Sequence, residues 1–112
     1  MNIIEKSREN MTRKELYMMT RNSAILKMRD AEGQEFSVKD WVKFVDTDSK
    51  TGESQELISV MADSGEVYAT NSATFIREFD EIVYIMEGEP FVIRVVGGQS
   101  KNGRHYITVE LV

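Results

Sequence analysis

The chain has 112 residues, of which 41% are hydrophobic and 29% charged, and its formal net charge is −5. This length allows one domain, and the composition is that of a folded globular protein. With no cysteine and one histidine, the sequence excludes a disulfide framework, a thiolate nucleophile and a cysteine-based zinc site. Its apolar runs are far shorter than the ~20 residues that cross a bilayer. The N-terminus also becomes charged before a signal-peptide core could form, so we expect a cytoplasmic protein without membrane partners.

The N-terminal third predicts a helical extension, residues 1–33, with a loosely held beginning. Thr12 and Glu15 match the S/T-x-x-E pattern of a capping box and predict a helix start. Asn22, or the serine after it, is placed to cap a second short helix that ends near Gly33. We expect this extension to pack on the domain that follows.

From Phe36 the hydrophobic period changes to two, which predicts a long strand. One parity is apolar and is expected to face the core: Phe36, Val38, Val42 and Phe44. The other parity is cationic and aromatic and is expected to face solvent: Lys39, Trp41 and Lys43. Because Asp40 falls on the apolar parity, we expect a bulge or bend at that residue.

The rest of the chain predicts four more strands and one clear helix. Asn71 or Ser72 caps the helix, apolar residues recur at three- and four-residue spacing as far as Met86, and Pro90 follows its end. The strands are predicted over residues 55–62, 66–70, 91–96 and 104–111, with the last two joined by the glycine-rich loop 97–103.

This element order predicts a mainly β protein with helices, specifically a five-stranded OB-fold-like barrel over residues 34–112. The helix lies between strands 3 and 4, and the helical extension precedes the barrel. In this fold, the loops that join strands 1–2 and 4–5 border a groove that binds oligonucleotides.

Charge is segregated along the chain. Residues 1–30 carry seven basic and four acidic side chains, residues 31–90 carry four and fourteen, and residues 91–112 carry three and one. A ligand responds to its local patch, because charges are screened over ~8 Å at physiological salt. The net charge therefore argues against tight non-specific DNA binding but is compatible with binding in a defined groove.

No pattern of residues predicts catalysis. Residues 98–103 have the glycine spacing of a phosphate-binding loop, but Arg104 and His105 replace the required Lys-Ser/Thr pair and a strand follows in place of a helix. The acidic segment 46–66 lacks the ligand pattern of a calcium loop. We expect no enzyme activity, no cofactor and no metal site.

Three features favour nucleic-acid binding. In the predicted strand from Phe36, Trp41 lies between Lys39 and Lys43, which suits a single strand because bases stack on aromatic rings and phosphates meet cations. The alternative is a tryptophan packed under the N-terminal helices with solvated lysines beside it. A further aromatic platform is Tyr68, whose parity is opposite to that of its apolar neighbours.

The last hairpin is the third feature. It carries Arg94, Lys101, Arg104 and Tyr106, and residues 91–109 contain no acidic side chain. Its glycines are expected to make the loop mobile and to allow a close backbone approach. The alternative is a flexible hairpin with ordinary surface charges.

The stretch from residue 16 to residue 112 resembles small single-stranded DNA-binding proteins of phages that infect Gram-positive bacteria. The resemblance rests on the segments Val38-Lys39-Asp40-Trp41, Gly65 through Phe75, and Ser100-Lys101-Asn102-Gly103-Arg104. It implies an OB-fold that coats single-stranded DNA in the host cytoplasm during phage replication or recombination, without catalysis. Many single-strand binders recruit replication enzymes through an acidic tail. Here residues 109–112 still belong to the last predicted strand, so we do not expect recruitment through such a tail.

The main hypothesis is therefore a non-catalytic single-stranded DNA-binding protein. Its predicted contact residues are Lys39, Trp41, Lys43, Tyr68, Arg94, Lys101, Arg104 and Tyr106. The alternative is a protein-interaction or structural phage accessory module that uses the acidic segment 46–66 and the methionine-bearing N-terminal helices. A homodimer through the barrel edges, and replication or recombination proteins as partners, stay open under both hypotheses.

Overall fold

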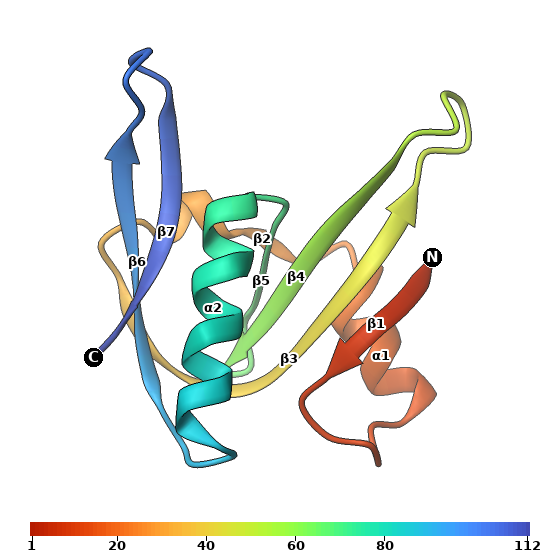
Figure 1. Cartoon of the computed structure of the whole chain (residues 1–112). Helices are drawn as coiled ribbons and strands as arrows, with labels where there is room; N and C mark the ends of the chain where they lie inside the picture. The colour runs from red at the N-terminus through yellow and green to blue at the C-terminus, as the bar shows by residue number, and fades with distance from the viewer.

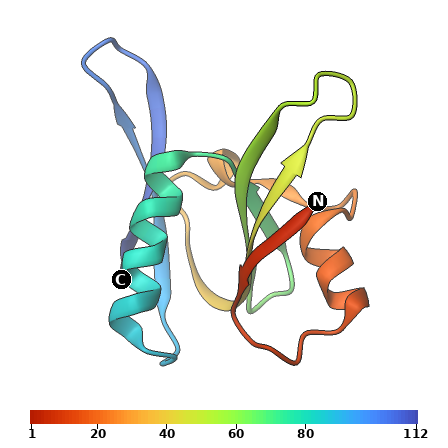
Figure 2. The same ribbon diagram turned by 45° about the vertical axis from the view of Figure 1, so that its right-hand side comes forward.

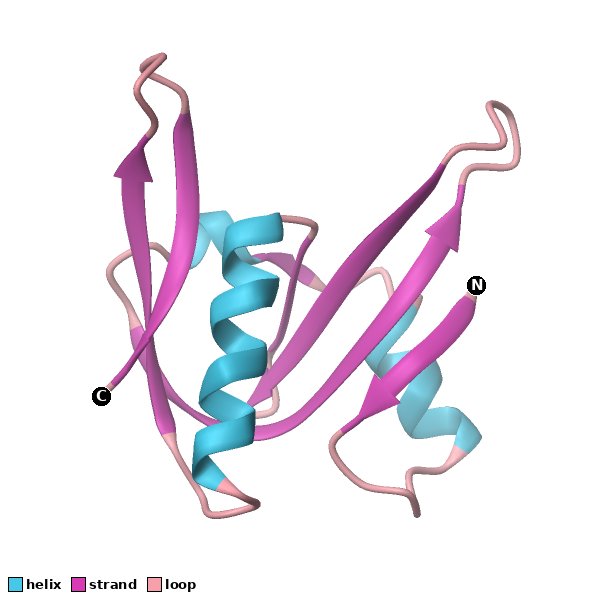
Figure 3. Cartoon of the chain, in the orientation of Figure 1, coloured by secondary structure: helices cyan, strands magenta, loops and turns pink.

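The computed structural model describes residues 1–112, which form one strongly curled, seven-stranded sheet with two α-helices (Figures 1 and 3). In chain order the elements are β1 (Asn2–Lys6), α1 (Arg13–Thr20), β2 (Leu26–Lys27), the 3-10 helix η1 (Met28–Ala31), β3 (Glu35–Thr47), β4 (Ser54–Ala62), β5 (Val67–Thr70), α2 (Ala73–Met86), β6 (Val92–Gln99) and β7 (His105–Leu111). The mainly β prediction is confirmed. Residues 34–112 contain five strands, β3 to β7, with α2 between the third and the fourth, and β1 and β2 of the N-terminal segment bring the sheet to seven strands.

The strands follow the order β2-β5-β4-β3-β6-β7, and β1 also pairs with β3. Only β2 and β5 pair in parallel. The long strand β3 makes the sheet curl, because its first residues pair with β6 whereas the rest pairs with β4 and β1. The two end strands of this order, β2 and β7, each lack a partner on one side, so the sheet forms an open half-barrel.

Two hairpins project from this half-barrel on either side of α2, and they diverge beyond the upper end of that helix (Figure 1). We call the β3–β4 hairpin, residues 44–57, the first arm and the β6–β7 hairpin, residues 96–108, the second arm. Strand β6 continues to Gln99, so Gly97 and Gly98 pair with β7 and do not belong to the loop as predicted.

The helices cover opposite faces of the sheet (Figure 2). On one face α2 buries an apolar stripe that includes Phe75, Phe79 and Ile82. On the other face Met19 of α1 packs in a smaller core with Phe44. None of the helices is long and apolar enough to cross a membrane.

The predicted N-terminal capping box is present. Thr12 Oγ1 accepts a hydrogen bond from the Glu15 amide at 3.1 Å, and the Glu15 carboxylate accepts one from the Thr12 amide at 3.0 Å. The second predicted helix is wrong, since β2 and η1 take its place. This segment runs parallel to β5, and it buries Met28 and Ala31 in the main core. The first residues, expected to be loosely held, form β1 along β3.

A bulge occurs in β3 where Asp40 predicted one, since the register with β4 shifts between Val38 and Asp40. An extra residue moves every following side chain to the other face of the sheet. Trp41 therefore joins the face of Phe36 and Val38, towards α2, and the downstream apolar parity faces α1.

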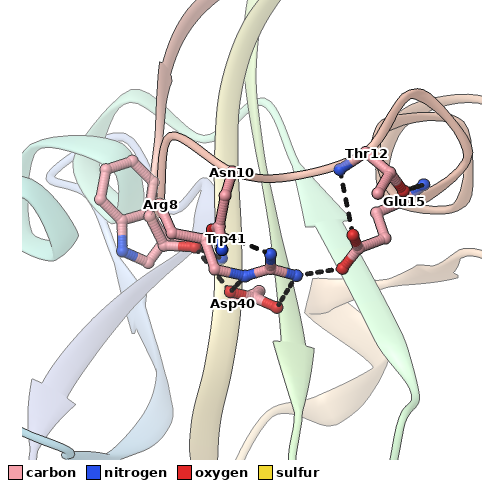
Figure 4. Close-up of polar contacts among 7 residues, drawn as sticks. Arg8, Asn10, Thr12, Glu15, Asp40 and Trp41 are labelled. Atoms are coloured by element: carbon pink, nitrogen blue, oxygen red, sulfur yellow. Dashed lines mark hydrogen bonds and ion pairs between the residues drawn. The ribbon is translucent and has the colours of Figure 1, made fainter.

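A polar network holds this bulge against the N-terminal segment (Figure 4). The Asp40 carboxylate accepts hydrogen bonds from Ser7 Oγ at 2.9 Å and from Arg8 Nε at 3.1 Å, and the Trp41 amide donates to Ser7 Oγ at 3.1 Å. Arg8 also pairs with Glu15 of α1. The hydrogen bonds from Arg8 to Asp40 and Glu15 raise the pKa of Arg8, so the guanidinium stays charged.

Candidate nucleic-acid interface

Two of the predicted stacking residues are part of the core. Trp41 is 7% exposed and meets Phe79 of α2 edge-on, with ring centroids 6.1 Å apart. Tyr68 is 8% exposed and stacks on Phe36 at 5.1 Å, and its burial raises the pKa of its phenol. The expectation that both rings face solvent is wrong.

The two errors have different causes. For Trp41 it is the bulge, which reverses the parity of the second half of β3. For Tyr68 the cause is that both faces of β5 are covered. Val67 lies in the core under α1, and Tyr68 lies in the core under α2. Alternation along a strand predicts one exposed face only where the sheet is covered on one side.

Two of the predicted phosphate contacts are already paired within the protein. Lys43 Nζ lies 2.9 Å from Asp80 Oδ2 of α2, and its side chain is 12% exposed. Desolvation alone would lower the pKa of Lys43, but the hydrogen bond and charge of Asp80 outweigh it and raise that pKa. Arg94 pairs with Glu35 across the β3–β6 ladder and lies 3.6 Å from Glu110, and the hydrogen bond to Glu35 raises its pKa.

Lys39 is exposed but belongs to another region of the surface. It lies at the bulge and borders a hollow of about 240 Å³ beside α1, together with Lys14 and Met18. The structure therefore does not bring Lys39 together with the second arm.

The other three predicted residues lie together on the second arm. Lys101 and Arg104 are exposed at its tip and form no ion pair within the chain. Tyr106 is 39% exposed in β7, opposite Gly98. This arm therefore offers two uncompensated cations next to one accessible aromatic ring.

A groove of about 580 Å³ runs beside this arm, between the two ends of the curled sheet. Its lining comes from β2 and η1 on one side, β7 on the other, and the β5–α2 connection at its base. The lining residues are Lys27, Met28, Arg29, Leu57, Ala69, Thr70, Asn71, Ser72, His105, Tyr106 and Ile107. None of them is acidic, although the chain has a net charge of −5.

The N-terminus of α2 adds to the positive potential of the groove. Asn71 and Ser72 line the groove immediately before the helix, where the helix dipole favours an anion. Ser72 accepts a hydrogen bond from the Phe75 amide and donates one to the carbonyl of Ile107 at 2.9 Å. That second bond fastens the helix to β7, so the base of the groove is fixed.

The first arm has the opposite charge. A hollow of about 290 Å³ on the first arm is lined by Asp46, Asp48 and Glu53 without a cation. Another, of about 470 Å³ beside α2, includes Glu56 and Asp80 together with Arg77. The two arms thus carry charges of opposite sign, and the groove lies beside the basic second arm.

Residues 8–112 match a family described as phage single-stranded DNA-binding protein. The chain belongs to this family. The search of curated proteins and the search of solved structures each found no match. The sequence resemblance is thereby confirmed, and membership of the phage single-stranded DNA-binding protein family supports single-stranded DNA binding by this chain.

For this member of the phage single-stranded DNA-binding protein family, sequence reasoning missed two residues of the groove, Lys27 and Arg29. The basic excess of residues 1–30 was a signal, but it did not say where those charges lie. Their position depends on the parallel pairing of Leu26 and Lys27 with β5, a contact between two short segments about 40 residues apart. No local pattern predicts such a pairing.

Proposed function

We propose that this chain binds single-stranded DNA, without catalysis, along the groove and the second arm. The observation that carries the proposal is a groove with two cationic side chains, a helix N-terminus and no acidic residue in its lining, in a chain whose net charge is −5. The carboxylate of Glu32 lies 2.8 Å from His105 Nε2 at the rim. Acidic side chains line the other hollows described above, so a polyanion has one favourable place on this side of the molecule.

Each side chain has a separate role. Lys27 and Arg29 would meet phosphates within the groove, and Lys101 and Arg104 would meet them at the tip of the second arm. The open face of Tyr106 would stack on a base. Every base has a face that can make this interaction, but in a duplex those faces are already stacked on one another. Trp41, Lys43, Tyr68 and Arg94 are not in the proposed contact set, because the core or an ion pair already occupies them.

We further propose that the half-barrel is an OB-like barrel built on residues 34–112, with residues 1–33 packed against it. In this assignment the two arms are the loops that border the oligonucleotide groove of that fold. The biological role would be to coat single strands during phage replication or recombination in the host cytoplasm.

Binding of a fluorescein-labelled oligothymidine, followed by fluorescence anisotropy, tests the proposal. The variants Lys27→Ala/Arg29→Ala and Lys101→Ala/Arg104→Ala should each weaken binding. The single variant Lys101→Ala has a matched control in Lys50→Ala at the tip of the acidic first arm, which removes the same charge from an equally exposed loop. Equal effects of Lys50→Ala and Lys101→Ala would refute the placement of DNA on the second arm.

A further inference from the structure

Gly98 lies in the interior of β6, opposite Tyr106 in β7. Its backbone does not require glycine: Gly103 at the tip of the arm has a φ of 78°, whereas Gly98 is not among the residues with a positive φ. Glycine within a strand weakens the strand, since it adds flexibility and has no side chain to pack. The absence of a side chain at this position therefore needs another reason.

The ring of Tyr106 supplies that reason. A Cβ atom placed on Gly98 would lie 2.7 Å from Cζ and 2.8 Å from Oη of Tyr106, well inside the ~3.5–4.0 Å of a normal carbon contact. The outer half of the ring therefore lies directly across the Gly98 backbone. No other aromatic ring of the chain stacks on Tyr106, and the side chain keeps considerable exposure.

We propose that Gly98 is a positioning residue, which holds the Tyr106 ring against the hairpin so that its opposite face is presented to a base. This rests on the proposed function, in which Tyr106 stacks on single-stranded DNA. A ring that is held in place before binding loses less freedom when a base arrives. Any side chain at position 98 would push the ring away from the strand, and the stacking face would lose its fixed orientation.

The variants Gly98→Ala, Tyr106→Ala and their combination test this assignment by anisotropy with labelled oligothymidine. Tyr106→Ala should raise Kd roughly 5- to 150-fold, the loss of one stacked base. Gly98→Ala should give a large part of that loss, and the double variant should be no weaker than Tyr106→Ala alone, because both changes remove the same interaction.

If Gly98 had only a structural role, its replacement would lower the melting temperature. In the positioning role, Gly98→Ala should melt at the same or a higher temperature while its affinity falls, because alanine is less flexible than glycine. Gln99→Ala, the exposed neighbour on the other face of β6, should bind normally, and Tyr106→Phe should keep most of the affinity because it retains the ring.

The outcomes separate this inference from the proposed function. If Tyr106→Ala binds more weakly and Gly98→Ala binds like the unaltered protein, Tyr106 keeps its role and the assignment of Gly98 is overturned. Additive losses in the double variant would overturn it as well. An unchanged Tyr106→Ala variant would remove the stacking role itself, and with it the role of Gly98.

Discussion

Replacing Trp41 with alanine should make the protein much easier to unfold without weakening DNA binding by the folded fraction. The indole is 7% exposed and packs edge-on against Phe79, so its removal leaves a cavity between β3 and α2. A tryptophan-to-alanine change in a core costs about 3–5 kcal/mol, whereas a domain of this size is stable by about 5–15 kcal/mol. On these ranges the substitution would remove between about a fifth and all of the stability.

Urea unfolding followed by far-UV circular dichroism measures this loss, because the variant lacks the only tryptophan of the chain. Trp41→Phe is the matched control: it keeps an aromatic ring against Phe79 and should lose less stability. The affinity for oligothymidine is then measured in the absence of urea and at low temperature, where the variant is folded, and it should equal that of the unaltered protein.

The opposite pattern would refute the reasoning. A Trp41→Ala variant with the unaltered unfolding midpoint and a weaker affinity would mean that the indole stacks on bases at the surface. The emission of Trp41 gives an independent check: α2 covers the ring, so oligothymidine should not quench it by direct stacking.

Three further predictions follow from the charges and the burial. Four contacting cations predict that log affinity falls against log salt concentration with a slope of about −3, and Lys27→Ala/Arg29→Ala should bring the slope to about −1.5. Burial raises the pKa of Tyr68 above its ordinary value of 10.0. The stability that depends on the neutral phenol is therefore complete below pH 10.0 and is lost as the pH rises through the raised pKa. Tyr68→Phe should make this alkaline loss of stability smaller. Asp40→Ala removes the acceptor for Ser7 and Arg8, so amide exchange in β1 should become faster and the urea midpoint should fall.

Each of these predictions has a control. Lys50→Ala should leave the salt slope unchanged, and an unchanged slope for the groove variant would place DNA elsewhere. Tyr84→Phe alters a tyrosine that is 79% exposed and should not change alkaline unfolding. The pKa of Lys43 is also raised and acts in the same direction, so some alkaline loss should persist in Tyr68→Phe. If Asp40→Ala left β1 as protected as before, the network of Figure 4 would not be what holds the strand.

The sequence was informative where structure depends on neighbouring residues. The capping box of α1, the apolar stripe of α2 and the bulge at Asp40 each follow from spacing within about ten residues, and each is present. The errors arose where distant segments meet. The strand β1 exists because β3 offers it an edge, and residues 26–31 do not form a helix because β5 and the core bind them in an extended and a 3-10 conformation.

The predicted site divided in the same way. Lys101, Arg104 and Tyr106 lie in a single hairpin, whose two strands present them together whatever the rest of the fold does. The burial of Trp41 follows from the bulge at Asp40 together with its effect on parity, because every residue after the bulge changes face. Lys43 and Arg94 have outward-looking sequence patterns, but Asp80 and Glu35 lie against them from elements 37 and 59 residues away.

The arrangement of the layers explains why the groove lies at the ends of the sheet. Here α2 covers one face of the sheet and α1 covers much of the other. Each of β3 and β5 thus places consecutive side chains in two different cores, and little of either strand is left to meet a ligand. The β2 and β7 ends of the sheet do not pair with each other, so they leave an opening that the core does not fill. Because backbone at such an edge is open to solvent, a flexible polyanion has access there to side chains and amides that the covered faces of the sheet do not offer.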